Sequence, residues 1–376
     1  MLNAREFPRD RFPRTLAAMK EGVAAGVAPG MVAGLWSITE PEQMLAHAEG
    51  VRRVVPTSQD LGVETVFDLA SVTKVMGTAT LAALLVERRW ISWDTSITSL
   101  LPEFPFPDIR FSHLLSHTAG LTAWKPFWQM LRDRFGQDPA VLARVPIRER
   151  QRAMRKFVME VAPEAAPGER MVYSDLSFLL LGFALEEALQ MDLDRAVTDL
   201  IWKPMGISGA SYRRVDRDAR QGSDEAVAAT ELCPWRGGVL QGQVHDDNTW
   251  AMGGYAGHAG AFGSARDVLG FARGLAMGFL SFETLNQAWS RVRLPEGCTR
   301  TLGWDTPSGP DSLVGRRFSG RSIGHWGFTG TGLWIDREAG IAVTLLTNRV
   351  HPSRENPAIR EFRPRFHNAL REDLAF

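Results

Sequence analysis

The order of strand-like and helix-like segments constrains the fold of this 376-residue chain more than any other feature. Short apolar segments bounded by Pro or Gly, which are typical of strands, occur near both ends of the chain. Residues 90–240 instead carry apolar side chains at helical spacing, with Pro and Gly at the breaks. This order predicts an α+β domain built from residues 1–75 and 245–376, with a mainly helical domain of residues 76–244 inserted and the active site between the two.

The individual elements follow from apolar periodicity and from the turn residues that separate them. Toward the N-terminus we expect a helix over 9–27, strands at 31–36, 44–47 and 65–69, and a long buried helix over 72–87. Helices in the middle are expected over 111–117, 126–135, 148–161, 175–190 and 193–203. Toward the C-terminus we expect a glycine-rich loop at 252–260, a helix over 266–277, strands at 322–326, 332–336 and 341–347, and a helical region over 356–371 interrupted at Pro364.

Composition argues against several classes of protein. Lys plus Arg and Asp plus Glu both number 43, and this balance gives no support to nucleic acid or an anionic membrane as a partner. The two cysteines are too few for a disulfide framework or a four-thiolate zinc site, and we expect no cofactor and no metal. The N-terminal residues lack the apolar stretch of a signal peptide, and no apolar run approaches the roughly 20 residues that span a bilayer. We therefore expect a cytoplasmic protein, unless a signal was trimmed from the chain, and leave its oligomeric state open.

The first chemical signal is Ser71 followed three residues later by Lys74, which is the only S-x-x-K pattern in the chain. Residues i and i+3 share one face of a helix, so the Lys amine can reach the Ser hydroxyl. A Ser hydroxyl becomes a good nucleophile when a base removes its proton, and Lys serves as that base where its pKa is lowered. Ser71 also opens a predicted helix, where backbone N–H groups favour developing negative charge. The competing interpretation is a Ser helix cap beside a solvent-facing Lys.

Two further signals lie later in the chain. Tyr173, one of only three tyrosines, lies two residues before Asp175, which can cap the helix that follows. Its phenol can relay a proton if it is held near the Ser and Lys, and the competing interpretation is a core Tyr. Residues 324–330, Gly-His-Trp-Gly-Phe-Thr-Gly, lead into the predicted hairpin. Their glycines let a substrate approach backbone N–H groups, and the competing interpretation is a tight turn with an incidental His.

In this order, S-x-x-K, Y-S-D and H-x-G, the three motifs resemble those of the penicillin-binding proteins and class C β-lactamases, a family of serine hydrolases that includes the family VIII carboxylesterases. Other stretches are similar to segments of the same family: FSHLLSHTAGL over 111–121, VHDDN over 244–248 and GHAG over 257–260. The resemblance covers roughly residues 10–350. It implies the β-lactamase and DD-peptidase-like fold, with an antiparallel sheet flanked by helices and an inserted all-helical domain.

The resemblance also implies roles for the residues that match its motifs. Ser71 attacks an acyl carbon and forms an acyl-enzyme, while Lys74 and Tyr173 move the protons and water later releases the acyl group. Supporting or substrate-binding roles are implied for Asp175, His325, Trp326, Gly327 and Phe328, the last through a backbone oxyanion hole shared with Ser71.

Two departures from the family pattern bear on the substrate. His325 lies where many members carry Lys and is only partly charged near neutral pH, and Asp175 adds a negative charge. Both features weaken the case for an efficient β-lactamase and fit a neutral ester or amide. The leading interpretation is a carboxylesterase-like hydrolase of small molecules. The alternatives are a β-lactamase or a D-amino-acid peptidase such as a DD-carboxypeptidase, and, in another class, a non-catalytic ligand-binding protein.

Three other patterns are interpreted as having no catalytic role. Ser322 lies in a G-x-S-x-G pattern, but a strand-like segment follows it rather than the helix that a nucleophile elbow requires. His113 and His117 lack the Glu of a metalloprotease helix and are interpreted as structural histidines. His245, which two Asp residues follow, is interpreted as part of a hydrogen-bonded loop rather than of a metal site.

Overall fold

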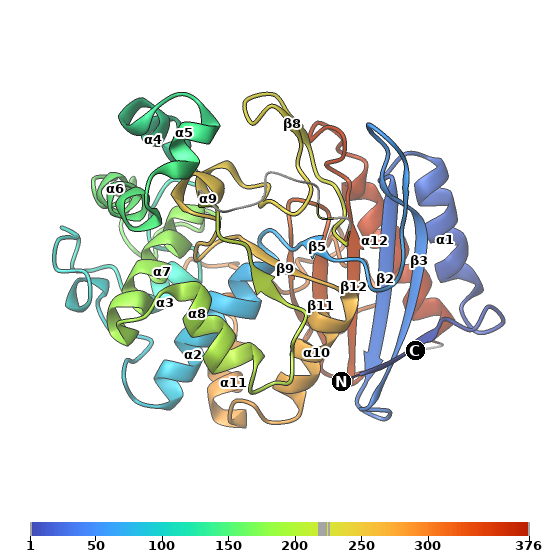
Figure 1. The fold of residues 1–376 in the computed structure, drawn as a ribbon. Coiled ribbons are helices and arrows are strands. Elements are labelled where there is room, and N and C mark those ends of the chain that lie inside the picture. The colour runs from blue at the N-terminus through green and yellow to red at the C-terminus, as the bar shows by residue number, and fades with distance from the viewer. Residues whose placement is uncertain (1, 217–223, 225, 375–376) are drawn as a thin grey trace.

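The chain folds into a sheet region and a helical region that lie side by side (Figure 1). The computed structural model describes residues 2–216, 224 and 226–374. The main sheet takes strands from both ends of the sequence: β1 (Asn3–Glu6), β2 (Gly30–Ser37), β3 (Gln43–Arg53), β4 (Gln59–Asp60), β10 (Ile323–Trp326), β11 (Gly332–Asp336) and β12 (Ile341–Thr347). Their order is β1-β3-β2-β12-β11-β10, with β4 beside β3. Neighbouring strands run antiparallel, except that β1 pairs with β3 in parallel.

The pairing of β2 with β12 joins the two ends of the chain in one sheet. Leu35 lies opposite Val343, and the register continues to Met31 opposite Thr347. Nearly all residues of both strands are buried, because helices cover both faces of the sheet. The strands predicted at 31–36, 332–336 and 341–347 are therefore confirmed.

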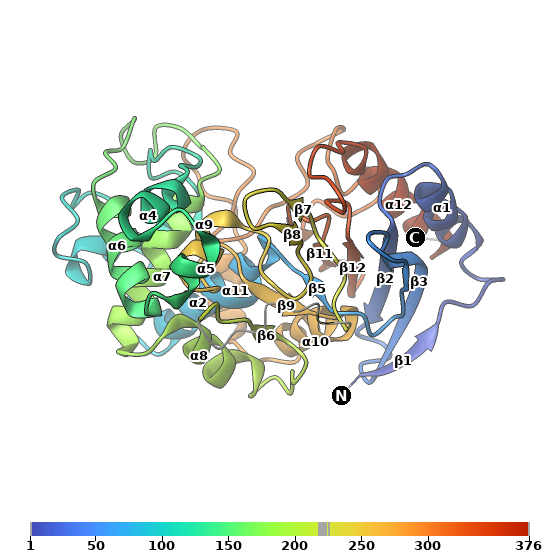
Figure 2. The ribbon, with the colours of Figure 1, turned by 45° about the horizontal axis from the view of Figure 1, so that its top comes forward.

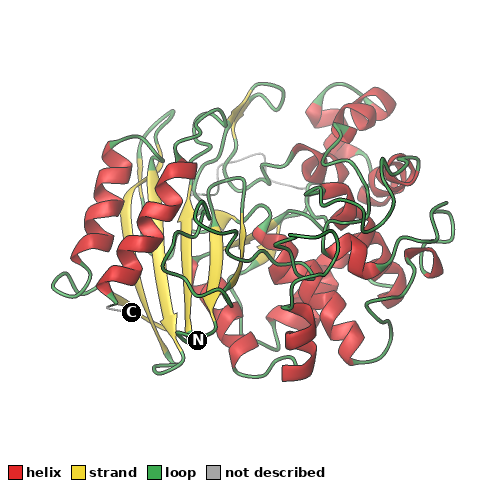
Figure 3. Ribbon diagram, turned by 180° about the vertical axis from the view of Figure 1, so that it is seen from behind, coloured by secondary structure: helices red, strands yellow, loops and turns green. Residues whose placement is uncertain are grey.

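Two helices cover one face of the sheet. Figure 3 shows α1 (Pro13–Ala24) and α12 (Ile359–Asp373) side by side on that face. Pro364 lies inside α12, so the predicted interruption there is wrong. Proline removes one backbone donor, but the helix is held by an apolar stripe that packs toward α1 and the sheet. The stripe consists of Ile359, Phe362, Phe366 and Leu370.

On the opposite face, α10 (Ala265–Ala276) packs against β2 and β12. The other helices are α2 (Thr80–Glu87), α3 (Phe111–Leu115), α4 (Phe127–Phe135), α5 (Pro139–Arg144), α6 (Ile147–Met159), α7 (Asp175–Leu189), α8 (Leu193–Val197), α9 (Asp247–Met252) and α11 (Phe282–Ala288). A 3-10 turn spans Ile97–Ser99, and a π-helical turn, Thr198–Trp202, extends α8. Short strands complete the fold: β5 (Phe67–Asp68), β6 (Ser211–Tyr212), β7 (Leu232–Cys233), β8 (Gly238–Val239) and β9 (Ala261–Gly263). Figure 2 shows β5 and β9 between the main sheet and the helices.

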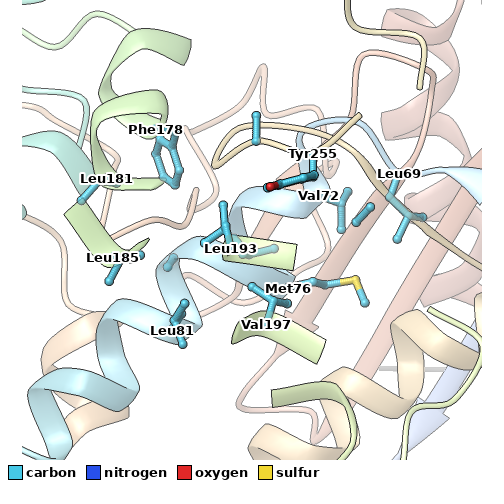
Figure 4. Packing of buried hydrophobic residues seen from close by; sticks show 14 of the residues in the cluster. Leu69, Val72, Met76, Leu81, Phe178, Leu181, Leu185, Leu193, Val197 and Tyr255 are labelled. Carbon is cyan, nitrogen blue, oxygen red and sulfur yellow. The ribbon is translucent and has the colours of Figure 1, made fainter. Parts of the chain in front are cut away.

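The long helix expected over 72–87 consists of two segments. A π-helical turn, Lys74–Ala79, leads into α2. The Thr78 hydroxyl donates to the Gly257 carbonyl at 2.7 Å, and this bond ties the wide turn to the glycine-rich loop. Figure 4 shows the segment packed among buried side chains of α7 and α8. Apolar periodicity did not reveal the π turn because all six of its residues are buried. Such turns are rare and occur frequently at functional sites.

The α+β class with a largely antiparallel sheet, flanked by helices, is the one that the sequence predicts. β1, α5 and α11 were not predicted from the sequence. The proposed boundaries of the two domains stay a prediction. Over the described ranges, no helix is both long and apolar enough to cross a membrane.

Candidate active site

A strained turn after β5 presents Ser71. Ala70, the preceding residue, has a φ of 45°, in the left-handed region that non-glycine residues rarely adopt. The Asp68 carboxylate accepts hydrogen bonds from the N–H groups of Ala70 at 2.8 Å and His245 at 2.6 Å. Burial raises the pKa of Asp68, although both N–H donors act against the rise. The hydrogen bonds to the Asp68 carboxylate therefore hold the turn at Ala70. This turn places Ser71 shortly before the π-helical segment that begins at Lys74.

Lys74 is completely buried and contacts Ser71 directly. Its ammonium donates to Ser71 Oγ at 2.8 Å, to Asp175 Oδ1 at 2.7 Å and to the His258 carbonyl at 3.1 Å. Burial disfavours the charge, but Asp175 and Tyr173 outweigh burial, so the pKa of Lys74 is raised. The sequence interpretation required a lowered pKa and is wrong on this point, because an anion touches the amine. Lys74 is an ammonium ion in the resting site.

Tyr173 lies between two cations and two imidazole rings. Lys74 Nζ is 5.0 Å from the centroid of the Tyr173 ring, and the Arg300 guanidinium carbon is 5.2 Å from it. The rings of His117 and His325 have their centroids 4.5 and 5.9 Å from that of Tyr173. Cations over an aromatic face are attracted to it, so these contacts help to hold the ring in place.

His325 is buried and uncharged at neutral pH. Burial, followed by the charges of Lys74 and Arg300, keeps the pKa of His325 well below its usual range. Its Nδ1 lies 2.9 Å from the Trp326 carbonyl, which only accepts hydrogen bonds, so Nδ1 carries the ring proton. Nε2 is then an acceptor, and it is buried without a partner in the described part of the chain. His325 therefore offers an acceptor where a Lys would offer a cation.

His117 has the opposite tautomer. Its Nδ1 accepts from the Ser174 N–H at 3.0 Å, so Nε2 carries the proton and is a buried donor that lacks a partner among the described residues. Burial holds the pKa of His117 well below its usual range. Its backbone has a φ of 61°. The interpretation of His117 as a structural histidine stays a prediction, and its ring also packs against that of Tyr173.

The turn between β10 and β11, residues 327–331, packs directly on the Ser71 turn. Thr331 Oγ1 donates to the Leu69 carbonyl at 2.9 Å, and Gly327 N–H donates to the Thr331 carbonyl at 2.8 Å. A Cβ atom on Gly327 would collide with Thr331 Oγ1 and lie 2.7 Å from the Leu69 carbonyl oxygen. Glycine is therefore required for this close approach of the two turns.

Two arginines orient the carbonyl groups of this turn. Arg349 Nε donates to the Phe328 carbonyl at 2.7 Å, and Arg363 donates to the Gly327 carbonyl at 2.9 Å. Burial and neighbouring arginines lower the pKa of Arg363 to about 9. Among the described residues, the N–H groups of Ser71 and Phe328 donate to no acceptor. Both N–H groups are available to bind a substrate oxygen.

Trp326 faces away from these groups. Successive side chains of a strand point to opposite faces, and Trp326 follows His325 in β10. Its ring lies 4.3 Å from the Arg363 guanidinium carbon and 5.3 Å from the His367 ring, on the α12 side. The structure therefore places Trp326 apart from the other predicted site residues.

The remaining sequence patterns lie in structural settings. Ser322 is buried and directly precedes β10, so it lacks the following helix of a nucleophile elbow. His245 lies 3.3 Å from a Glu231 carboxylate oxygen and its ring stacks with Phe328. Within the described residues, no group of three or more His, Cys, Asp or Glu side chains is arranged to hold a metal ion.

Sequence reasoning missed several residues that complete the site. They are Arg300 over Tyr173, His258 as an acceptor for Lys74, and Arg349 and Arg363 behind the β10–β11 turn. The GHAG segment gave a signal for His258 through its likeness to the family. The arginines gave none, because nothing in their local sequence distinguishes them from surface arginines.

A family model described as Beta-lactamase matches residues 16–364. The chain belongs to the β-lactamase family. Curated relatives named D-alanyl-D-alanine carboxypeptidase, from Salmonella agona and Salmonella typhi, are each 29% identical over 326 residues, which is 78% of this chain and 72% of theirs. The chain is therefore a serine hydrolase of this family, as the motifs predicted.

Solved structures share the fold. EstCE1, described as a hydrolase with promiscuous acyltransferase activity, has a TM-score of 0.72 at 19% identity over 96% of this chain and 98% of its own. The LovD6 mutant of simvastatin synthase from Aspergillus terreus has a TM-score of 0.71 at 19% identity over 98% and 96%. SurE with D-Leu has a TM-score of 0.68 at 21% identity over 96% and 76%. At these identities the likeness establishes the fold alone.

Proposed function

We propose that the chain is a carboxylesterase-like hydrolase in which Ser71 is the nucleophile and Lys74 and Tyr173 are its proton-transfer partners. The 2.8 Å hydrogen bond from Lys74 Nζ to Ser71 Oγ, inside a buried polar site, carries this proposal. An uninvolved surface Lys would be solvated, whereas this one is completely buried and has three hydrogen-bond acceptors.

The base is the Lys74–Tyr173 pair after it has lost one proton. Because the two groups are coupled, the proton is assigned to the pair and not to one of its two atoms. Ser71 Oγ forms a bond to the acyl carbon while its proton passes to this pair. The pair then protonates the leaving alcohol as its bond to the acyl carbon breaks. Water that the pair deprotonates attacks the acyl-enzyme, the acid leaves, and Ser71 recovers its proton.

The N–H groups of Ser71 and Phe328 supply the oxyanion hole. Both lack an acceptor in the described chain, and the arginines behind the turn fix the Gly327 and Phe328 carbonyls. Donors that are held in place before the reaction stabilise developing charge without reorganising, which is the main reason oxyanion holes accelerate acyl transfer.

A neutral substrate fits the electrostatics of the site. His325 is an uncharged acceptor, and the Asp175 carboxylate lies beside Lys74 with about 20% of its side chain exposed. Neither group attracts the carboxylate of a β-lactam. An ester with a short acyl chain needs no such cation, because its carbonyl oxygen binds the two N–H groups.

The proposal is tested with p-nitrophenyl butyrate as substrate. We expect p-nitrophenol release by the wild type, its loss in Ser71→Ala, and mass-spectrometric detection of a butyryl adduct on Ser71. Ser322→Ala is the matched control, because it removes a buried hydroxyl in a competing motif and should retain activity. Equal turnover in the wild type and Ser71→Ala would disprove Ser71 as the nucleophile.

A second candidate is cleavage of peptides that end in a D-amino acid. Arg300 supplies a cation 5.2 Å from the Tyr173 ring centroid, and the Salmonella relatives carry the name of such a peptidase. Asp305 lies 3.5 Å from Arg300 and neutralises part of its charge, which makes this candidate the weaker one. If a substrate carboxylate binds Arg300, Arg300→Gln abolishes cleavage of N-acetyl-D-alanyl-D-alanine and spares p-nitrophenyl butyrate. The absence of such cleavage by the wild type rejects this candidate.

A further inference from the structure

An apolar groove lies between α10, α11 and the ends of β2 and β11. Its volume of about 460 Å³ is within the roughly 300–1,000 Å³ that is usual for small-molecule sites. Trp36, Leu285 and Trp289 line it. Phe282 and Ile38, at its edge, are 75% and 50% exposed, so the apolar surface opens to solvent. Open apolar surface of this kind marks binding sites more often than it occurs by chance.

Two arginines give the groove a positive end. Arg321 is exposed and makes no hydrogen bond or ion pair within the described residues. Arg337 lies 5.1 Å above the Trp289 ring and donates to Asn286 Oδ1 at 2.9 Å, but it has no carboxylate partner among the described residues. Burial and the charge of Arg321 lower the pKa of Arg337. Two like charges thus share one rim.

Asp336, the acidic residue among those that line the groove, does not neutralise Arg321 and Arg337. The Asp336 side chain is completely buried and accepts from the backbone N–H groups of Ser319 at 3.0 Å and Ala339 at 3.2 Å. It also lies 3.4 Å from Arg371, behind the wall of the groove. The charge that faces the groove is therefore that of the two arginines.

The groove is separate from the Ser71 site. Arg321 precedes β10 and Arg337 follows β11, whereas the turn at residues 327–331 lies at the other end of the same hairpin. Strands rise about 3.4 Å per residue, so the five residues of β11 separate the two places by roughly 15 Å. A ligand bound in this groove therefore does not contact the residues around Ser71.

We propose that this groove binds an amphipathic carboxylate, namely a linear alkyl chain with one terminal carboxylate. The alkyl chain lies against the tryptophans and Leu285, and the carboxylate pairs with Arg321 and Arg337. Guanidinium groups match the two oxygens of a carboxylate, and the apolar wall suits a chain without branches or polar groups. This proposal does not depend on the ester substrate proposed for Ser71.

The test titrates the wild-type protein with decanoate by isothermal calorimetry and follows tryptophan fluorescence. We expect saturable binding that tightens roughly threefold to fourfold for each CH₂ added between octanoate and decanoate. Arg321→Gln combined with Arg337→Gln should weaken it at least tenfold, and Ala276→Trp should block it by filling the groove. Decanol should bind more weakly than decanoate. Arg9→Gln is the matched control, because Arg9 is exposed and distant in sequence from the groove.

Hydrolysis of p-nitrophenyl butyrate and the melting temperature are measured on every variant. The melting temperature shows whether a variant is folded, so the binding test is independent of the proposed catalytic function. Hydrolysis, where the wild type shows it, adds a second check on folding. Arg321→Gln alone should perturb folding less than the double variant, since Arg321 makes no hydrogen bond or ion pair with the residues that the structure describes. The proposal is overturned if decanoate binds the double variant and Ala276→Trp as tightly as it binds the wild type. It is also overturned if the wild type shows no saturable binding.

Discussion

The layer that α1 and α12 form on the sheet and the site around Ser71 are both buried, but they bury different chemical groups. Phe12, Met19 and Phe366 fill the α1–α12 layer. At the site, Lys74 and His325 are buried instead. Burial of apolar area contributes about 25 cal/mol per Å², whereas a buried polar group costs free energy unless it is hydrogen-bonded. The α1–α12 layer therefore stabilises the fold, and the site around Ser71 uses that stability to hold polar and charged groups in place.

Arg363 belongs to both regions. It lies on α12, and its guanidinium reaches through the layer to the carbonyls of Gly327 and Thr331 in the turn beside Ser71. Substitutions can therefore separate three kinds of effect, namely loss of catalysis alone, loss of stability alone, and loss of both.

The largest effect is expected for Lys74→Ala, which removes one member of the proposed Lys74–Tyr173 base beside Ser71. We expect kcat/KM for p-nitrophenyl butyrate to fall by about 10²- to 10⁴-fold, the usual contribution of a general base. Lys203→Ala, at an exposed Lys that pairs with Asp199, is the matched control and should keep full activity. Activity of Lys74→Ala within tenfold of the wild type would contradict the role of Lys74.

Phe366→Ala should affect stability alone. The side chain is completely buried between α12 and the sheet, so its removal should lower the free energy of unfolding by about 3–5 kcal/mol. The measurement is urea denaturation, together with kcat below the transition. Phe282→Ala, at a 75% exposed Phe, should change stability by less than about 0.5 kcal/mol. A large loss of kcat in folded Phe366→Ala would show that the layer and the site are not separable.

Arg363→Met should affect both quantities to a smaller extent. Two buried carbonyls lose their donor, which should lower the free energy of unfolding by about 1–3 kcal/mol. Because the same carbonyls hold the turn that presents the Phe328 N–H, we also expect kcat to fall about tenfold with little change in KM. Arg363→Lys should restore part of kcat by keeping a cation at this place. A lower free energy of unfolding with unchanged kcat would show that Arg363 stabilises the α1–α12 layer and has no effect on catalysis.

The smallest effect is expected for Asp175→Asn, which should change the pH dependence of kcat/KM. The carboxylate of Asp175 helps to raise the pKa of Lys74, and burial of Lys74 opposes that rise. Activity requires Lys74 to give up a proton, so it rises with pH through the pKa of Lys74. Without the Asp175 charge that pKa falls, and the rising limb of the kcat/KM profile should move to lower pH. A limb that stays in place or moves to higher pH would contradict this assignment.

Much of the fold could be predicted where a short apolar run is bounded by turn residues. The strands at 332–336 and 341–347 agree with β11 and β12, because β-branched and apolar residues, together with the turn at Ala339–Gly340, define them locally. Pro364 was misjudged because the packing of α12 outweighs one missing backbone donor. The π turn at Lys74 was missed because a uniformly buried segment has no periodicity to read.

The candidate site divides in the same way. That Ser71, Lys74, Tyr173 and Asp175 lie together in one candidate site could be predicted, since short motifs in a fixed order carry them. Their electrostatic state could not be predicted. The contact between Lys74 and Asp175 spans 101 positions of sequence and reverses the expected direction of the Lys74 pKa shift.

The sequence by itself determined most of the elements, the class of fold and the family of the chain, because local periodicity and motif chemistry depend on residues close together along the chain. Only the tertiary structure decided that Lys74 is a resting cation, that His325 is a neutral acceptor and that Trp326 faces α12. It also decided that arginines from distant helices and loops hold the turn beside Ser71. The physical reason is that burial and charge act through space, so these properties depend on which groups the fold brings within a few ångströms of one another.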